Sequence, residues 1–300
     1  PNLEGIILVN DFSVLVSRSE KLTYARENLN ALFGQKFPKN FRKEHISYYK
    51  DTADEMLVLN YTSGTTSFSK GVMLPSKSMW SNIEFGREKL GKCLKAGDSI
   101  VSMLPMAHMY GMAFEFLYEL TVGMHIYFLT KIPSPKIIFQ ALNEIKPSVV
   151  VAVPLIIEKI FKGKVKKMFT SNAFMNTLYG VSFIRRYLHR IAGKKLTKTF
   201  GGRIRFFGIG GSKLDGEVEQ FLLDANFIYD VGYGLTETAP LIAGMVDGML
   251  RHGSTGPILK GIENRLENVD ENTGIGELVV KSPSQMQGYY KNPEATAAAF

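Results

Sequence analysis

The chain has 300 residues, 45% of them hydrophobic, which is enough to bury a sizeable core in one large domain or two smaller ones. A single cysteine, Cys93, excludes an internal disulfide framework and indicates a reducing compartment such as the cytoplasm. The start of the chain shows no arginine-led signal peptide, and Glu115, Glu119 and His125 interrupt the most apolar window, residues 112–129, too often for a membrane span.

The formal net charge of +8 is unevenly distributed along the chain. No Asp or Glu lies between Glu158 and Asp215, and this span contains fourteen Lys and Arg residues. Such a field attracts anions: a nucleotide, coenzyme A, anionic lipid or nucleic acid. The alternative is a solvated basic face with no dedicated partner. Nucleic acid is disfavoured, because no module known to bind it is recognised in the chain.

The first fifty residues predict a strand, a helix and a linker. The apolar run over residues 5–11 predicts a buried strand that ends at a polar turn. Helical spacing over residues 19–33 places the leucines on one stripe. Residues 37–49 are basic and aromatic, which indicates a linker.

A loop of small and hydroxylated residues follows. Every residue from Thr62 to Ser67 is small or hydroxylated, Lys70 comes next, and apolar runs over residues 56–59 and 72–74 flank the loop. This pattern predicts strand, tight loop, strand. Small residues let backbone N–H groups approach an anion, hydroxyls donate to its oxygens and the lysine adds charge, although a polar surface turn is the alternative. A Walker loop is disfavoured, because Lys70 lacks the Gly before it and the Ser or Thr after it.

Strands and helices then alternate. The expected strands cover residues 98–104, 123–129, 149–153, 204–207 and 227–231, and the expected helices cover residues 76–90, 113–120, 135–145 and 217–225. Ser76 or Ser78 is the expected N-cap of the first helix. Alternation of this kind predicts an α/β fold, with a mostly parallel sheet and helices on both of its faces. Short strands and turn residues after residue 253 predict a small antiparallel β region, so we divide the chain into an α/β core (1–253) and the start of a β-rich subdomain (254–300).

Residues 208–212, Gly-Ile-Gly-Gly-Ser, lie between a strand and a helix. A dinucleotide fingerprint needs glycine at the next position, which is Lys213, so a Rossmann site is excluded. Close approach of the glycine backbone to a flat ring or a phosphate remains open, and so does a plain turn.

Residues 232–238 offer an aromatic ring, a hydroxyl and a carboxylate just past a strand end, where ligands gather in open α/β sheets. Tyr233 could stack on a base, Thr236 could bond a phosphate oxygen and Glu237 could hold magnesium. The alternatives are a core tyrosine, a helix cap and a solvated acid. His108, in an expected loop over residues 106–111, is a further candidate, although a lone histidine is usually structural.

These segments together resemble the adenylate-forming, or AMP-binding, enzymes: acyl-CoA synthetases, peptide-synthetase adenylation domains and luciferases. Residues 61–74 are similar to their Tyr-Thr-Ser-Gly-Thr-Thr-Gly-x-Pro-Lys-Gly-Val-Met-Leu signature but have Ser67 in place of Gly and Ser69 in place of Pro, which changes the stiffness and allowed dihedrals of the loop. Residues 232–238 are the second specific match. The turn at 208–212, the Leu-Pro-x-x-His segment at 104–108 and the Gly-Tyr-x-x-x-Pro-Glu-x-Thr segment at 288–296 support it.

Two segments are similar to the long-chain fatty acid branch of that family. They are Val-Pro-Leu-Ile-Ile-Glu-Lys at residues 153–159 and the basic stretch over residues 185–206. A basic helix that carries Phe183 and Tyr187 could make a peripheral contact with the inner face of a membrane through residues 183–205, and packing on its own domain is the alternative.

The resemblance implies a ligase that converts a long-chain fatty acid, ATP and coenzyme A to acyl-adenylate and then acyl-CoA, with ATP/AMP and Mg²⁺ in the site. No protein nucleophile is needed, because such transfer depends on positioning and charge neutralisation. The residues implied to be catalytic are Thr66, Lys70, His108 and Glu237. Those implied to bind the nucleotide are Thr62, Ser63, Gly64, Thr65, Gly210, Gly211, Ser212, Gly232, Tyr233, Gly234 and Thr236. Magnesium would bind Glu237 and Thr65.

The family also has upstream sequence, a ribose-binding aspartate, a hinge and a mobile C-terminal domain with an adenylation lysine, none of which we find in these 300 residues. We therefore expect the central part of a larger ligase, with little or no activity alone. Two other functions stay open: an adenylating ligase for a short-chain, aryl or amino acid, and a non-catalytic ATP- or lipid-binding module. In every case we expect Lys70 and Tyr233 to share one cleft.

Overall fold

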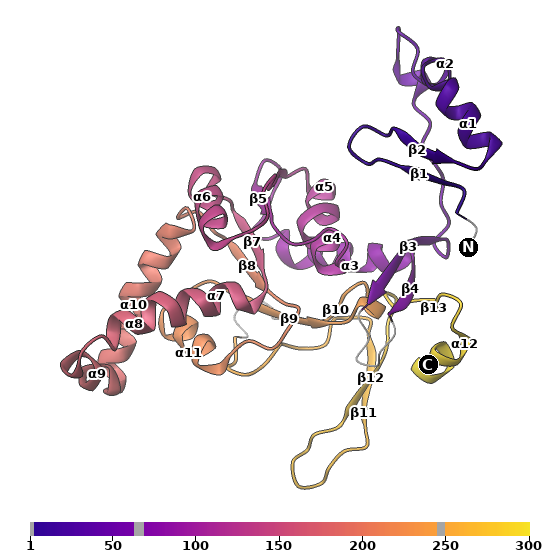
Figure 1. The fold of residues 1–300 in the computed structure, drawn as a ribbon. Coiled ribbons are helices and arrows are strands. Elements are labelled where there is room, and N and C mark those ends of the chain that lie inside the picture. The colour runs from indigo at the N-terminus through magenta and orange to yellow at the C-terminus, as the bar shows by residue number, and fades with distance from the viewer. Residues whose placement is uncertain (1–2, 63–68, 245–249) are drawn as a thin grey trace. The chain divides into compact units, whose positions relative to one another are not determined.

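The computed structural model describes residues 3–62, 69–244 and 250–300. The chain forms two compact units, Pro1–Asp51 and Thr52–Phe300 (Figure 1). Each is described by itself below. The boundary that we expect at residue 253, between the α/β core and the β-rich subdomain, does not coincide with this division and stays a prediction. Among the described residues, every helix is too short or too polar to span a bilayer.

The small unit is a β-hairpin followed by two helices. Strands β1 (Gly5–Ile7) and β2 (Val14–Ser17) pair antiparallel. Residues 8–11 lie outside β1, and Ile7 is 48% exposed, so the prediction of a buried strand over residues 5–11 is wrong. A two-stranded ribbon offers too little partner surface to bury its apolar side chains. The helix expected over residues 19–33 is two helices, α1 (Glu20–Glu27) and α2 (Leu29–Lys36), which are separated at Asn28.

The large unit contains a six-stranded sheet in the order β10-β9-β8-β7-β5-β6, which is parallel except for the β9–β10 pair. The mostly parallel sheet predicted from the alternation is therefore confirmed. The strands are β5 (Ser99–Ser102), β6 (His125–Phe128), β7 (Val149–Ala152), β8 (Phe206–Ile209), β9 (Asp230–Gly234) and β10 (Leu241–Gly244).

Helices cover both faces of this sheet, and β7 shows how the two faces divide. Successive side chains of a strand point to opposite faces. Val150 and Ala152 pack in a core with helices that follow β6, β7 and β8, and Val149 and Val151 pack in a second core with helices from earlier in the chain. The first core is covered by α6 (Pro135–Ile145), α7 (Pro154–Ile160), α10 (Ser182–Thr199) and α11 (Gly216–Asp224), and the second by α3 (Ser76–Leu90), α4 (Met109–Met112) and α5 (Tyr118–Val122).

Several of these helices differ from the prediction in detail. Helix α3 begins at Ser76 with Pro75 as its N-cap, because the buried Ser78 instead donates a hydrogen bond to the carbonyl of Gln285 at 2.7 Å. Helix α4 lies partly within the loop expected over residues 106–111. A π-helical turn, η2 (Ala113–Leu117), then joins α4 to α5. The remaining helical segments are η1 (Lys43–His45), η3 (Phe161–Lys166), α8 (Lys167–Phe169), α9 (Ala173–Gly180), η4 (Thr236–Thr238) and α12 (Pro293–Ala299).

Two smaller sheets are antiparallel. Strands β3 (Met56–Thr62) and β4 (Lys70–Pro75) pair on either side of the predicted loop, with Thr62 opposite Lys70, and β13 (Gly288–Tyr289) pairs with the other edge of β4. Strands β11 (Glu263–Glu267) and β12 (Glu277–Lys281) form a hairpin, as the short strands expected after residue 253 suggested.

A polar network joins the first residues of three parallel strands. The buried Asp98 lies just before β5 and accepts hydrogen bonds from the Lys95 N–H at 2.8 Å and from the Ser148 hydroxyl at 3.2 Å. It also forms an ion pair with Arg205, which precedes β8. One carboxylate therefore ties together the starts of β5, β7 and β8.

Candidate functional site

A cavity of about 870 Å³ lies at the carboxyl ends of β5, β8 and β9 and extends to β4 and to the β11–β12 hairpin. We call it the cleft. Its volume falls within the range of small-molecule and cofactor sites, and its position at the strand ends is where open α/β sheets bind ligands. The predicted site residues that line it are Thr62, Lys70, His108, Gly210, Gly211, Gly232, Tyr233, Gly234, Thr236 and Glu237.

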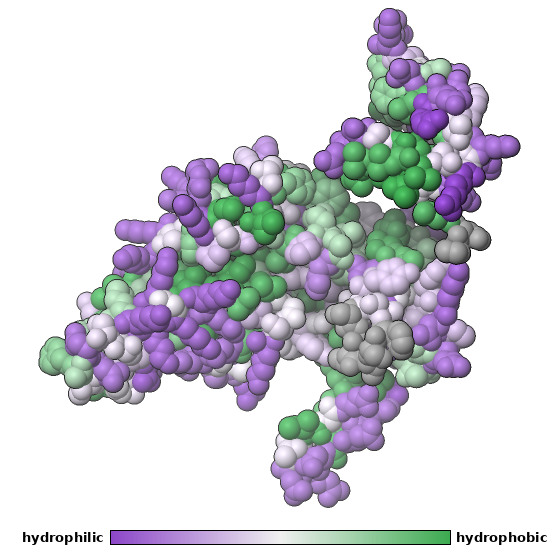
Figure 2. Space-filling view, viewed as in Figure 1, coloured by the Kyte–Doolittle hydropathy of each residue, from purple (hydrophilic) through white to green (hydrophobic). Residues whose placement is uncertain are grey.

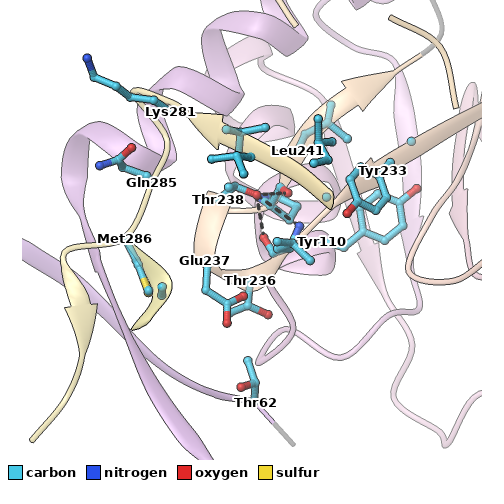
Figure 3. Close-up of a pocket in the computed structure, with 18 of the residues that line it drawn as sticks. Thr62, Tyr110, Tyr233, Thr236, Glu237, Thr238, Leu241, Lys281, Gln285 and Met286 are labelled. Atoms are coloured by element: carbon cyan, nitrogen blue, oxygen red, sulfur yellow. Dashed lines mark hydrogen bonds between the residues drawn. The ribbon is translucent and has the colours of Figure 1, made fainter. Parts of the chain in front are cut away.

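Lys70 and Tyr233 share this cleft, as expected. In Figure 3 the side chains of Thr236 and Glu237 point toward Thr62, whereas Tyr233 lies at the right of the view, away from Thr62. Of the predicted residues that the structure describes, Ser212 does not line the cleft. The predicted Ser63, Gly64, Thr65 and Thr66 lie outside the described residues. The catalytic, nucleotide-binding and metal-binding roles of all these residues stay predictions.

Glu237 is oriented by a tyrosine that the sequence did not assign to the site. The Tyr289 hydroxyl donates a hydrogen bond of 2.8 Å to Oε1 of Glu237. The Lys70 ammonium lies 4.9 Å from the centroid of the same tyrosine ring. Burial and the neighbouring carboxylate raise the pKa of Tyr289, so its hydroxyl stays protonated and remains a donor. Tyr289 therefore contacts both the Lys70 ammonium and the Glu237 carboxylate.

The backbone of residues 286–290 holds this tyrosine in place. The Met286 N–H donates to the Glu237 carbonyl at 2.7 Å, the Gln287 N–H to the Met73 carbonyl at 2.8 Å and the Tyr290 N–H to the Gly71 carbonyl at 2.7 Å. The segment thus bridges β4, which begins at Lys70, and the turn that carries Glu237. The Gly-Tyr segment was noted only as part of the resemblance, and no local pattern in it indicates the bond to Glu237.

The turn with Glu237 is also anchored to helix α3. The buried Asn82 accepts a hydrogen bond from the Leu241 N–H at 2.9 Å and donates one to the Thr238 carbonyl at 3.1 Å. The Thr238 hydroxyl donates to the Pro240 carbonyl at 2.7 Å. These bonds fix the residues on both sides of the turn, so Thr236 and Glu237 are presented to the cleft on a rigid support.

His108 is the N-cap of α4, and its Nδ1 accepts a hydrogen bond from the Tyr110 N–H at 3.2 Å. The loop before it is anchored by Glu115, whose Oε2 accepts hydrogen bonds from the Met103 and Leu104 N–H groups at 3.0 and 2.8 Å. Burial raises the pKa of Glu115 to about 8. In the sequence Glu115 was visible only as an interruption in an apolar window, and its role in holding the loop of His108 was missed.

The backbone conformation and the packing of the fold explain why glycine occupies several positions in the cleft. Gly211 has φ +91°, a backbone conformation that favours glycine. A Cβ on Gly210 would lie 3.1 Å from the Tyr110 ring, and a Cβ on Gly234 would lie 1.8 Å from the Pro240 carbonyl oxygen. The plain-turn alternative therefore accounts for Gly211, and close packing accounts for the other two, without a ligand.

The described residues fit magnesium only as part of a nucleotide complex. Within residues 3–62, 69–244 and 250–300, no three His, Cys, Asp or Glu side chains cluster as they would around a metal held by protein alone. Mg²⁺ usually keeps several waters and takes one or two carboxylates together with substrate phosphates. The Glu237 carboxylate has two oxygens, so it can bind a cation while it accepts the bond from Tyr289.

The β11–β12 hairpin adds charged groups that the sequence analysis did not place here. Arg265 and Lys281 line the cleft, and so does Glu277. Arg265 contacts Glu267 at 2.6 Å and Lys281 contacts Glu263 at 3.3 Å, both in exposed pairs. The hairpin therefore lines the cleft with charged groups beside the apolar Leu278, Val279 and Val280.

Comparisons with known proteins identify the family and the fold of this chain. The family described as AMP-binding enzyme matches residues 9–290. Long chain acyl-CoA synthetase 5 of Arabidopsis thaliana is 28% identical over 275 residues, which cover 82% of this chain and 40% of the relative. Long-chain-fatty-acid–CoA ligase 4 of Saccharomyces cerevisiae is also 28% identical over 275 residues, which cover 86% of this chain and 40% of the relative.

A solved structure shows the same fold. ATP-bound MatB from Rhodopseudomonas palustris superposes with a TM-score of 0.64 at 22% identity, over 85% of this chain and 45% of that one. The chain thus spans less than half the length of each of these three relatives. Since the family match extends over almost the whole sequence and the fold agrees, this chain belongs to the AMP-binding enzyme family.

Proposed function

We propose that the cleft binds ATP with magnesium, and that the chain supplies the nucleotide site of a ligase that activates a long-chain fatty acid. The observation that carries the proposal is the chain of contacts from Lys70 through Tyr289 to Glu237, which places a cation and an anion around one space. Tyr233 lines the same space and is 39% exposed, so its ring is accessible to a purine.

The two ends of the cleft would bind different parts of ATP, one the phosphates and the other the base. Thr62 and Lys70 face each other at the mouth of the loop, where a hydroxyl and an ammonium would bind phosphate oxygens. Thr236 would donate a further hydrogen bond to the phosphates, and Glu237 would hold the magnesium ion. The ion, when bound, would neutralise charge on the triphosphate. Tyr233, from the other end, would stack on the base.

The reaction would proceed in two steps. A carboxylate oxygen of the fatty acid attacks the α-phosphorus of ATP, and the bond to the bridging oxygen breaks, so acyl-adenylate and pyrophosphate form. The thiol of coenzyme A then attacks the acyl carbon, loses its proton and displaces AMP. His108 caps α4 and lines the cleft, and it would position the fatty acid carboxylate. The long-chain substrate rests on the names of the relatives in A. thaliana and S. cerevisiae.

Calorimetry with ATP, in the presence and absence of magnesium, tests the nucleotide site. We expect Lys70→Ala and Tyr233→Ala each to weaken binding about tenfold, because each removes one charge or stacking contact. Lys131→Ala and Tyr24→Ala are matched controls on exposed side chains that do not line the cleft. An unmodified chain that binds no ATP, or controls that weaken binding as much as the cleft variants, would refute the proposal.

Isotope exchange between pyrophosphate and ATP tests the acid separately, with a panel of fatty, aryl, dicarboxylic and amino acids. Exchange that depends on a long acyl chain is the expected result. Exchange that depends on another class of acid would support the proposed nucleotide site but contradict the proposed long-chain substrate. ATP binding with no exchange for any acid would favour a non-catalytic binding module.

A further inference from the structure

A second surface of the large unit, on helices α9 and α10, carries exposed apolar side chains. Neither helix contributes a residue to the cleft. Phe174 on α9 is 72% exposed, and Phe183, Tyr187 and Ile191 on α10 are 74%, 65% and 49% exposed. The last three are spaced by four residues, so they form one stripe along the helix. Figure 2 shows pale green, mildly hydrophobic surface at the end of the large unit where Figure 1 draws α9, beside hydrophilic side chains along α10.

Packing within the unit does not account for this stripe. The opposite face of α10 is the buried one, where His189, Ala192 and Leu196 contact the core. His189 bonds the Tyr179 hydroxyl at 2.8 Å and the Asp224 carboxylate at 3.0 Å. These bonds fix the rotation of α10 about its axis. Helix α10 therefore has two apolar faces, and the one with Phe183 faces outward.

Basic residues lie between the apolar ones on the outward face. Arg190, Lys194 and Lys198 are exposed and lie at positions that alternate with the apolar stripe around the helix. Acidic side chains of α11 and its N-cap contact other bases: Asp215 contacts Lys162, Glu217 contacts Lys166 and Asp224 contacts Arg186. We call Phe174, Phe183, Tyr187, Ile191, Arg190, Lys194 and Lys198 the apolar–basic face.

We propose that the apolar–basic face binds the surface of an anionic lipid membrane. A helix that lies on a membrane buries aromatic and aliphatic side chains at the boundary between headgroups and acyl chains, and its Lys and Arg side chains contact anionic headgroups. At 1.5 Å per residue, the 18 residues of α10 extend over roughly 27 Å, long enough to lie along such a surface. This proposal does not depend on what the cleft binds.

Single-stranded nucleic acid also binds basic surfaces with aromatic side chains, but two observations favour a membrane. Helix α9, which presents Phe174, contains no charged residue, so it offers no cation to a phosphate backbone. Ile191 is aliphatic and cannot stack on a base. Both features suit insertion into lipid.

Co-sedimentation of the chain with vesicles tests the proposal. We expect binding to phosphatidylcholine vesicles that contain phosphatidylserine, little binding to phosphatidylcholine alone, and weaker binding as salt is added. Arg190→Gln and Lys194→Gln should each weaken the partition about fivefold. Phe174→Gln combined with Phe183→Gln should weaken it more, and this loss should persist at high salt because it is not electrostatic.

Matched controls are Lys131→Gln for the charges and Tyr48→Gln for an exposed aromatic side chain elsewhere in the chain. Circular dichroism of each variant verifies that it folds, and the surface positions keep the substitutions away from the core. The proposal is overturned if the unmodified chain fails to bind anionic vesicles, if folded face variants bind as well as the controls, or if a single-stranded oligonucleotide binds the face more tightly than the vesicles do.

Discussion

Tyr289→Phe is the sharpest test of the cleft, because it removes one oxygen and leaves the ring in place. The lost group is the hydroxyl that donates to Glu237 at 2.8 Å. A hydrogen bond to a charged group contributes about 1.5–3 kcal/mol, which is about tenfold to 150-fold in a binding constant. Glu237 is only half-buried, and water can replace part of the bond, so we expect the lower end, about tenfold.

The loss should appear in magnesium-dependent ATP binding, measured by calorimetry at several magnesium concentrations. Without magnesium, Tyr289→Phe should bind ATP nearly as well as the unmodified chain, since the ring still lies 4.9 Å from the Lys70 ammonium. Tyr289→Leu should lose affinity under both conditions, because it also removes that cation–π contact, which contributes about 0.5–2 kcal/mol.

Tyr290→Phe is the matched control, since it removes the same atom from the next residue, whose ring lies 5.1 Å from Lys291 instead. An equal effect of Tyr290→Phe would show that the loss is not specific to Glu237. If Tyr289→Phe leaves magnesium-dependent binding unchanged, Tyr289 does not position Glu237 for the ion and the reasoning is refuted.

Three further predictions concern stability. Burial, with Glu115 nearby, raises the pKa of Glu119 to about 8 from 4.5, and neither carboxylate oxygen has a hydrogen-bond partner among the described residues. The folded state then holds the proton more tightly than the unfolded state, so the free energy of unfolding falls as pH rises from about 4.5 to about 8. In urea titrations across this window, the free energy of unfolding of Glu119→Gln should fall less than that of the unmodified chain. Equal dependence on pH in the two proteins would contradict this. Asp98→Ala should cost about 3 kcal/mol in the same assay, because it leaves Arg205 and two other donors without their acceptor, and a loss below about 1 kcal/mol would contradict the network. Gly234→Ala should lower the free energy of unfolding by about 1–3 kcal/mol or more, since the new Cβ meets a carbonyl at 1.8 Å, whereas Gly163→Ala, with no atom within 4 Å, should cost little; equal effects would contradict the packing argument.

The elements predicted most accurately from the sequence are those whose spacing and capping signals lie within a few residues of the element itself. Helix α6 begins and ends where its spacing placed it, at Pro135 and Ile145, and Ser134 caps it by accepting a hydrogen bond from the Ile137 N–H. Helix α3 also has its predicted bounds. Its predicted serine cap was wrong, because Ser78 bonds a carbonyl more than two hundred residues away.

The parts of the cleft that could not be predicted are contacts between distant segments. Asn82 reaches Leu241, and Tyr289 reaches Glu237, but neither pair leaves a periodic pattern in the sequence. Residue types at 61–70 and 232–238 predicted two sides of a nucleotide site, the first for the phosphates and the second for the base, and the structure brings Lys70 and Tyr233 to one cleft. The groups that orient these side chains became visible only with the fold.

The alternation along β7 has a practical consequence for mutagenesis. Val150 and Val151 are neighbours in the chain, yet Val150 shares a core with α10, which carries the apolar–basic face, and Val151 shares one with α3 and α4, which support Asn82 and His108. Truncating the first valine should loosen the packing beneath the apolar–basic face, and truncating the second should loosen the packing beside the cleft. Substitutions at two adjacent residues should therefore affect two different surfaces separately.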